Sequence, residues 1–257
     1  MGGIYMNLST EDIMREYEEL KKHGFPIGET LDFGEELGRS AEIALHFEFI
    51  IEDGKKPRPQ RWHPEDFYRF HGQEGVDYLR PLLTSQDEEY AVGAAYLMAE
   101  LLLKGRYLNQ AELTSELIGA LVALAESEVP EHRRKSIIAL GWVGTENEIP
   151  MLKRHLLSDP DSLCRAWSAS SFLQMSGRIP EAVLRKRTAG ALIACLENET
   201  DVFVRGVAVE TVQVVWDVKL GLRSSAVDDR NQKAVNRGVR RALEFLTAEN
   251  CFTGNGS

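Results

Sequence analysis

Residues 158–172 read SDPDSLCRAWSASSF, and this stretch decides the fold. An acidic, proline-containing turn is followed by Arg165, and the small side chains of Ser168 and Ser171 come three and six residues after that arginine. Residues three apart lie on the same face of an α-helix. The stretch therefore predicts a helix with a narrow face of small side chains, against which a neighbouring helix can pack closely.

The same pattern recurs on both sides of this stretch. Arg133 and Arg205 are each followed, at the same two offsets, by small side chains. A weaker copy begins at Tyr90 and has Ala91 in place of the arginine. The anchor positions 91, 133, 165 and 205 are 42, 32 and 40 residues apart. Periods of this length are typical of helical repeat arrays, in which each unit packs against the next one.

Prolines mark where the predicted helices begin. Pro130, Pro150, Pro160 and Pro180 are separated by 20, 10 and 20 residues, and each precedes an apolar-periodic segment. Proline suits the first helical position because its ring pre-sets φ and its missing N–H has no helical partner there. We therefore expect a helical hairpin used twice, with Asp159 capping the helix that Pro160 begins. The second helices of the hairpins are expected at 150–157, 180–196 and 229–246.

The arginine-led copies resemble HEAT-type repeats, including the bacterial subgroup similar to phycobilisome-lyase repeats. Asp161 and Asp201, each four residues before a repeat arginine, fit the same pattern. The resemblance covers about residues 85–247 and implies an all-α fold, an α-solenoid of about four helical pairs. It also implies that the second helices line the concave face. The motifs of this family are packing motifs, so the resemblance specifies architecture rather than activity.

Residues 1–84 do not repeat and are expected to form an acidic, irregular helical N-terminal cap on the array at 85–247, which a flexible tail at 248–257 follows. Solenoids need such caps because their end faces would otherwise expose core side chains. Within the cap we expect helices at 9–22 and 30–51, a loop at 52–60, and an aromatic-rich block at 62–71 that leads into residues 76–83.

Composition and charge narrow the class of protein. The chain has 257 residues, 43% of them hydrophobic, and a formal net charge of −10. Residues 1–128 carry 25 acidic and 12 basic side chains, whereas residues 129–257 carry 15 and 18. The acidic half disfavours attraction to phosphate backbones and favours a basic protein partner. No apolar run approaches the ~20 residues of a membrane span, there is no signal peptide, and the three cysteines suit a reducing compartment, so we expect a cytoplasmic protein.

Candidate catalytic groups are few. His63 and His71 are eight residues apart, which does not suit one shared metal ion on a helix. Cys164 falls near a predicted helix N-terminus beside Arg165, where its pKa would be lowered, but no histidine accompanies it and it occupies an apolar slot of the repeat. No glycine-rich phosphate loop is present. The sequence therefore favours a protein without catalysis or cofactor.

Basic side chains concentrate on the predicted second helices, where the resemblance implies a positively charged groove. The alternative is a set of ordinary solvated helix faces. The residues predicted to contact a partner in this groove are Lys153, Arg154, Arg185, Arg187, Arg237, Arg240 and Arg241, with Lys186 and Lys233 beside them.

These observations predict a non-enzymatic protein-binding scaffold, either an adaptor or an immunity-type inhibitor that masks a toxin. A first alternative is a nucleic-acid-binding protein similar to HEAT-like DNA glycosylases, with arginines on phosphates and an exposed tryptophan near a base. A second is a lyase-like protein that handles tetrapyrroles, for which only the repeat motif matches. The tryptophans in question are Trp142, Trp167 and Trp216, which would otherwise fill wedges between repeats.

Overall fold

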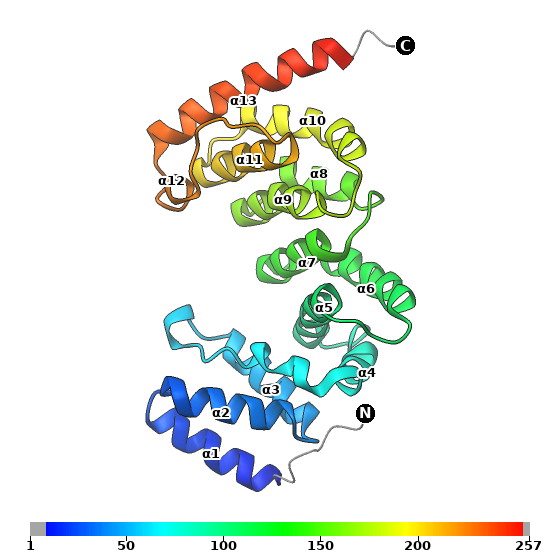
Figure 1. Ribbon diagram of the computed structural model, residues 1–257, viewed down its shortest axis with the longest axis vertical. Helices are drawn as coiled ribbons and strands as arrows, with labels where there is room; N and C mark the ends of the chain where they lie inside the picture. The colour runs from blue at the N-terminus through cyan, green and yellow to red at the C-terminus, as the bar shows by residue number, and fades with distance from the viewer. Residues whose placement is uncertain (1–8, 254–257) are drawn as a thin grey trace. The chain divides into compact units, whose positions relative to one another are not determined.

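The computed structural model describes residues 9–253, without the side chains of residue 58 and of residues 249–253. Every regular element in this range is a helix, as Figure 1 shows along the colour ramp from blue to red. The predicted all-α fold is confirmed. The internal contacts divide the chain into two compact units, residues 1–120 and 121–257.

The N-terminal unit begins with three amphipathic helices and continues through a short irregular segment into longer ones. Its elements are α1 (Thr10–Lys22), α2 (Ile27–Gly38), α3 (Ile43–Gly54), the 3-10 turns η1 (Arg58–Gln60), η2 (Pro64–Asp66) and η3 (Tyr68–His71), α4 (Gly72–Leu82) and α5 (Glu88–Lys104). The helix α6 (Gln110–Leu124) runs across the boundary between the two units.

The single helix predicted at 30–51 is wrong, because α2 and α3 are separate helices. The buried Ser40 breaks the run: its hydroxyl donates to the Leu37 carbonyl at 2.8 Å and accepts the Glu42 amide at 3.2 Å. Such short side-chain bonds offer the backbone an alternative to helical pairing. The backbone at Phe67 passes close to Gly38 at the end of α2. A Cβ on Gly38 would lie 2.5 Å from the Phe67 carbonyl oxygen, so only glycine fits at this position.

Aromatic rings fill the core of the N-terminal unit. Tyr17 stacks on Phe49 at 4.2 Å between ring centroids, and Phe25 stacks on Trp62 at 5.6 Å. Trp62 is 6% exposed, so this tryptophan of the aromatic-rich block is part of the buried core of the unit. The loop that carries it is held by the fully buried carboxylate of Asp53, which accepts the Trp62 and His63 amides.

The C-terminal unit contains the repeated hairpins, and each helix packs on its neighbours in the chain. This arrangement confirms the predicted α-solenoid with its irregular helical N-terminal segment. The elements are α7 (Pro130–Val143), α8 (Ile149–Ser158), α9 (Ser162–Met175), α10 (Glu181–Asn198), α11 (Val202–Val215), α12 (Ser224–Asp228) and α13 (Gln232–Thr253). Residues 254–257 of the predicted tail lie outside the described residues.

Two helix starts differ from the prediction. The first helix of the central repeat starts at Ser162 rather than Pro160, and Asp161 rather than Asp159 caps it by accepting the Cys164 amide at 2.8 Å. Asp159 is buried and binds other groups, so it cannot serve as the cap. The last predicted second helix starts at Gln232 rather than at position 229, because α12 and a turn occupy the preceding residues.

The small-residue faces do bring helices close. Ser171 of α9 is fully buried and its hydroxyl donates across to the Ile137 carbonyl of α7 at 2.8 Å. Thr211 of α11 makes the same contact with the Ala169 carbonyl of α9 at 2.9 Å. These hydroxyls reach the backbone of the preceding repeat because no larger side chain stands between the helices. The first helices α7, α9 and α11 therefore form a tightly packed row.

Candidate functional site

Most of the basic residues predicted to line a groove are already engaged within the C-terminal unit. Arg154 pairs with Glu126. Arg185 donates to the Val215 carbonyl and to Glu181, both at 2.8 Å. Arg187 lies 3.4 Å from a Glu146 carboxylate oxygen, and Arg241 donates to the Leu220 carbonyl at 3.0 Å. These four arginines reinforce the repeat contacts, and the groove that they were expected to share stays a prediction.

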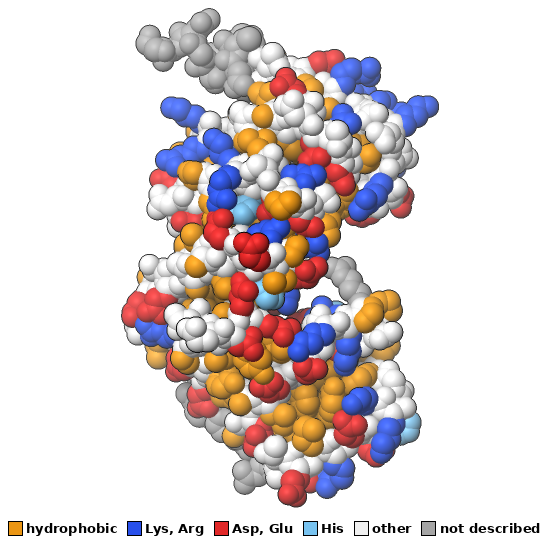
Figure 2. Space-filling model, turned by 180° about the vertical axis from the view of Figure 1, so that it is seen from behind, with side chains coloured by type: hydrophobic (Ala, Val, Ile, Leu, Met, Phe, Trp, Pro, Cys, Tyr) orange, Lys and Arg blue, Asp and Glu red, His pale blue; other side chains and the backbone are white. Residues whose placement is uncertain are grey.

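Three cations without an ion pair to any described side chain lie together on α13. Lys233, Arg237 and Arg240 are exposed, make no ion pair with any described side chain, and line one shallow depression together with Gln232 and Asn236. Their spacing of four and three residues places them on one helix face. Figure 2 shows many Lys and Arg side chains over the upper, C-terminal part of the molecule. Two further exposed or half-exposed lysines without an ion pair, Lys153 and Lys186, lie on α8 and α10.

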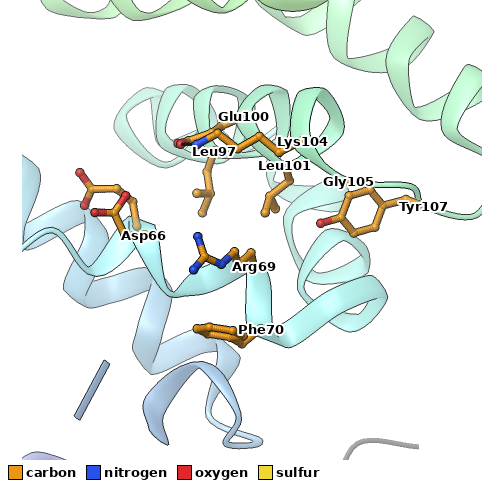
Figure 3. A pocket seen from close by; sticks show the side chains of 10 residues that line it. Asp66, Arg69, Phe70, Leu97, Glu100, Leu101, Lys104, Gly105 and Tyr107 are labelled. Carbon is orange, nitrogen blue, oxygen red and sulfur yellow. Dashed lines mark hydrogen bonds and ion pairs between the residues drawn. The ribbon is translucent and has the colours of Figure 1, made fainter. Parts of the chain in front are cut away.

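A cavity of about 260 Å³ lies inside the N-terminal unit, between the segment η2–η3 and α5 (Figure 3). Leu97 and Leu101 of α5 form one wall and are nearly fully buried. Phe70 faces them, Tyr107 closes one side, and Arg69 projects between Phe70 and the leucines. The lining thus combines these apolar side chains with charged ones, which are Arg69, Glu65, Asp66, Glu100 and Lys104.

Some of the charged side chains that line this cavity form ion pairs, and others do not. Glu100 and Lys104 pair with each other. Arg69 lies 4.9 Å from the Phe70 ring centroid and has no carboxylate within ion-pair distance among the described residues. Glu65 uses one carboxylate oxygen to bind Arg61 at 2.8 Å, whereas its other oxygen, Oε2, is buried and makes no hydrogen bond.

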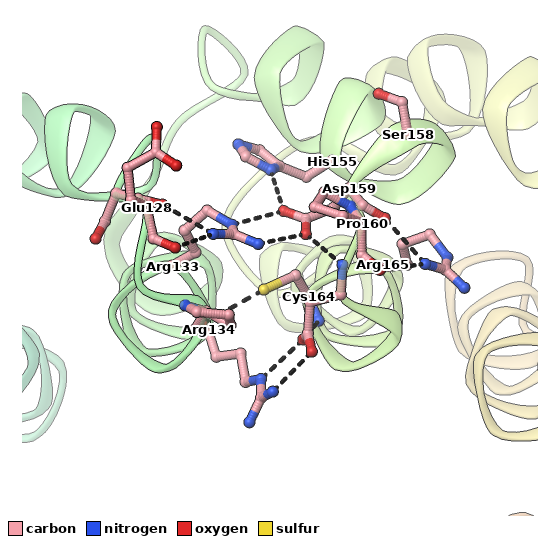
Figure 4. Close-up of polar contacts among 12 residues, drawn as sticks. Glu128, Arg133, Arg134, His155, Ser158, Asp159, Pro160, Cys164 and Arg165 are labelled. Carbon is pink, nitrogen blue, oxygen red and sulfur yellow. Dashed lines mark hydrogen bonds and ion pairs between the residues drawn. The ribbon is translucent and has the colours of Figure 1, made fainter.

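The repeat arginines form a ladder of buried contacts (Figure 4). Arg133 of α7 is 8% exposed and binds both carboxylate oxygens of Asp159, at 3.0 and 2.9 Å. The same guanidinium donates to the Ser127 carbonyl at 2.8 Å. His155 also contacts Asp159 through Nδ1 at 2.9 Å. Burial alone would raise the pKa of Asp159, but these hydrogen bonds, together with that from the Asp161 amide, lower it on balance.

The next repeat uses the same geometry. Arg165 of α9 binds both carboxylate oxygens of Glu199, at 2.6 and 3.2 Å, and donates to the Asp159 carbonyl at 2.9 Å. In the third copy Arg205 donates to Asn236 at 3.0 Å, an amide in place of a carboxylate. Arg133 and Arg165 thus each tie the loop before their own helix to the following repeat, whereas the Arg205 contact runs to α13. In its first two copies the ladder pairs each arginine with a carboxylate, whereas Arg205 has a neutral amide as its partner and its buried Nε makes no hydrogen bond with any described residue.

Cys164 lies inside this ladder and is fully buried. Its thiol is 3.6 Å from the Pro130 carbonyl oxygen. Burial and the nearby carboxylates of Asp159 and Asp161 raise the pKa of Cys164 to about 12. The packing interpretation of this cysteine is confirmed, because a nucleophilic cysteine needs the opposite shift.

The other candidate groups are dispersed. His63 is exposed, whereas His71 is buried against His46 at 2.9 Å between ring nitrogens. Trp216 is 8% exposed, and Trp167 packs edge-on against Phe203. No group of three or more histidine, cysteine, aspartate or glutamate side chains in the described part of the chain could hold a metal ion. No helix among the described residues is long and apolar enough to cross a bilayer.

The carboxylate partners of the ladder were missed in the sequence. Asp159 and Glu199 each lie six residues before the next repeat arginine, a spacing that is visible once the copies are aligned on Arg165 and Arg205. The cavity was missed as well, because Arg69 comes from a segment that does not repeat.

Comparison with known proteins supports the architecture. A family model for HEAT repeats matches residues 76–172, which agrees with the predicted resemblance over residues 85–172 of the expected range 85–247. The comparison with curated proteins gave no match. A crystal structure of an engineered protein is similar, with a TM-score of 0.47 and 20% sequence identity, covering 84% of this chain and 96% of that one. HEAT repeats generally serve as scaffolds for protein interactions.

Proposed function

We propose that this protein is a non-enzymatic, protein-binding scaffold, of the adaptor or immunity-inhibitor type, and that the basic face of α13 docks an acidic segment of its partner. The observation that supports this is the contrast among the predicted groove residues. Arg237 and Arg240, with Lys233, are exposed and pair with no described carboxylate, whereas Arg154 and Arg187 form ion pairs within the fold.

The geometry of this face suits an extended peptide. Seven residues separate Lys233 from Arg240, which is about 10 Å along a helix. An extended chain rises by ~3.3 Å per residue, so a run of three or four acidic residues spans the three cations. Contacts of this kind at an exposed surface chiefly raise the association rate and select the partner.

The N-terminal unit carries a net charge opposite to that of the α13 face. Residues 1–120 carry 23 acidic and 12 basic side chains, a net charge of −11, whereas residues 121–257 carry 17 and 18. A partner with a basic surface and an acidic segment would be matched by both. Two kinds of protein would use these charges: an inhibitor that masks a basic toxin, and an adaptor that joins two partners.

The test compares the charge reversal R237E/R240E with the matched control R154E/R187E, which changes the net charge equally at engaged positions. Fluorescence polarisation measures binding of a labelled Asp/Glu-rich peptide at low salt. We expect R237E/R240E to weaken binding roughly tenfold, from about 1.4 kcal/mol of lost charge contacts, and the control to have little effect. An equal loss in the control would refute the assignment of the site to α13.

A labelled DNA duplex of the same charge is the second probe. Even a non-specific nucleic-acid binder retains duplex at low salt, because binding releases condensed counterions. If the protein binds the duplex more tightly than the peptide, the scaffold proposal is wrong and the nucleic-acid alternative replaces it.

A further inference from the structure

The exposed surface of α2 carries three acidic side chains that pair with no described cation. Glu29 and Asp32 are exposed and Glu36 is half-buried. Their spacing of three and four residues places them along one helix face. Arg39, which directly follows α2, does not neutralise them, because it is engaged by Glu35 at 3.4 Å. These three side chains are called the acidic face of α2 below.

The surroundings of this face favour its being covered by a second molecule. Burial and, after it, the nearby charge of Glu36 raise the pKa of Glu16 on α1, so negative charge is crowded here. The same helix exposes two apolar side chains one turn apart, Ile27 at 81% and Leu31 at 52%. A docked helix that carries cations would relieve the crowding and would remove apolar area from water.

We propose that the acidic face of α2 docks on the basic face of α13 in a second copy of this chain. The inference rests on the proposed function, because it uses the same α13 face, and it names one acidic segment which that face receives. Each copy offers one face of each sign, so the contact is heterologous and joins copies head to tail.

The spacing of the two faces matches when the helices run antiparallel. The cations of α13 are separated by four and then three residues, and the acids of α2, taken from Glu36 backwards, are separated by four and then three as well. Each row extends over seven residues, which is about 10 Å along a helix. One register therefore forms all three pairs, which are Lys233 with Glu36, Arg237 with Asp32, and Arg240 with Glu29.

Glu244 fits the same register. It is exposed and lies four residues after Arg240, so it continues the row of charges on α13. In the antiparallel arrangement it falls beside the N-terminus of α2, where Pro26 supplies no side-chain cap. Negative charge is favourable at a helix N-terminus. The acid that ends the basic row thus meets a site that attracts it.

The contact should be weak and sensitive to salt. Exposed ion pairs contribute little to binding individually, and salt screens them. Contact between two helices belongs with interfaces that bury less than about 1,200 Å² in total, and these form transient complexes. We therefore expect self-association at high protein concentration and its loss in concentrated salt.

Sedimentation velocity of the full chain, from about 10 µM to about 1 mM, covers the range of weak complexes. The variant E29K/D32K/E36K reverses the α2 face, and K233E/R237E/R240E reverses the α13 face. We expect the parent protein to self-associate as its concentration rises, and each variant to do so at least about tenfold more weakly. E11K/E18K/E19K, at exposed positions of α1, changes the net charge as much as the α2 variant does and is the control.

An equal mixture of the two variants separates a docked contact from a general effect of charge. Alone, each variant has two faces of the same sign, whereas in the mixture every face meets one of opposite sign. Three reversals change the net charge of −10 by six in either direction, so both variants stay negative overall and do not attract each other non-specifically. We expect the mixture to associate, and the chain with all six reversals to self-associate as the parent protein does.

Binding of the labelled Asp/Glu-rich peptide distinguishes this inference from the proposed function. E29K/D32K/E36K retains the α13 face and should bind the peptide as the parent protein does at low protein concentration. If it binds no peptide, the proposed function fails whatever the sedimentation shows. If it binds the peptide while the parent protein stays a monomer at every concentration, the self-association alone is wrong.

Three further outcomes would overturn the self-association. The first is that the mixture of the two variants stays monomeric. The second is that E11K/E18K/E19K loses as much association as E29K/D32K/E36K. The third is that the parent protein associates as strongly in 1 M salt, where the screening length is about 3 Å, as it does at low salt.

Discussion

Two buried histidines in the N-terminal unit make the stability of this protein depend on pH. His46 of α3 and His71 of η3 are 0% and 4% exposed, and their ring nitrogens lie 2.9 Å apart. His46 Nε2 lies 3.0 Å from the Pro64 carbonyl, which can only accept, so His46 carries its proton on Nε2 and His71 donates from its own Nε2 to His46 Nδ1. Both rings are thus bonded as neutral imidazoles.

Burial lowers the pKa of His46 to about 3 and that of His71 to about 4. In the unfolded chain both have a pKa of ~6.5, so below that pH the unfolded state binds more protons than the folded state. Stability is therefore fully present above pH ~6.5 and is lost as the pH falls toward the folded pKa values. Between pH 7 and pH 5 the loss is about 2 kcal/mol for each histidine, or about 4 kcal/mol together.

Urea unfolding followed by circular dichroism at pH 7, 6 and 5 measures this loss. Near pH 5 the two histidines contribute a slope of about 2–3 kcal/mol per pH unit to the free energy of unfolding. The double variant His46→Leu/His71→Leu, which removes both partners of the bond, should lack this part of the slope. His23→Gln at the exposed end of α1 is the control. If the double variant and the parent protein lose stability equally between pH 7 and 5, the reasoning is refuted.

Three further predictions concern the C-terminal unit. Asp159→Ala should cost about 3–5 kcal/mol because Arg133 stays buried without its partner, and the pair Arg133→Met/Asp159→Leu should recover much of that loss in thermal unfolding. Gly141→Ala places a Cβ 3.0 Å from the Ser171 Cα and should cost about 1–3 kcal/mol as α7 and α9 move apart; an unchanged melting temperature would contradict the close packing. Cys164, with its pKa raised to about 12, should resist iodoacetamide at pH 8 in the folded protein and react after unfolding, as mass spectrometry of its peptide would show.

The repeat architecture was predictable because its signals are local. A helix face of small residues, an arginine at its start and a proline or aspartate before it all act within about two turns of chain. The predicted helices that begin near Pro130 and Pro150 accordingly match α7 and α8. The predicted helix at 30–51 failed for the complementary reason: its apolar pattern continues through Ser40, and only the side-chain bonds of that residue end α2.

The sequence by itself determined that this protein is a helical array with a charge contrast between its ends. The tertiary structure decided which charges are free. Arg185 binds a carbonyl 30 residues away, and Asp159 binds an arginine 26 residues before it, so neither pairing is visible in a local pattern. Arg69 and Lys233 have no carboxylate within ion-pair distance among the described residues. Pairing depends on distances of a few ångström between segments far apart in the chain, and only the fold sets those distances.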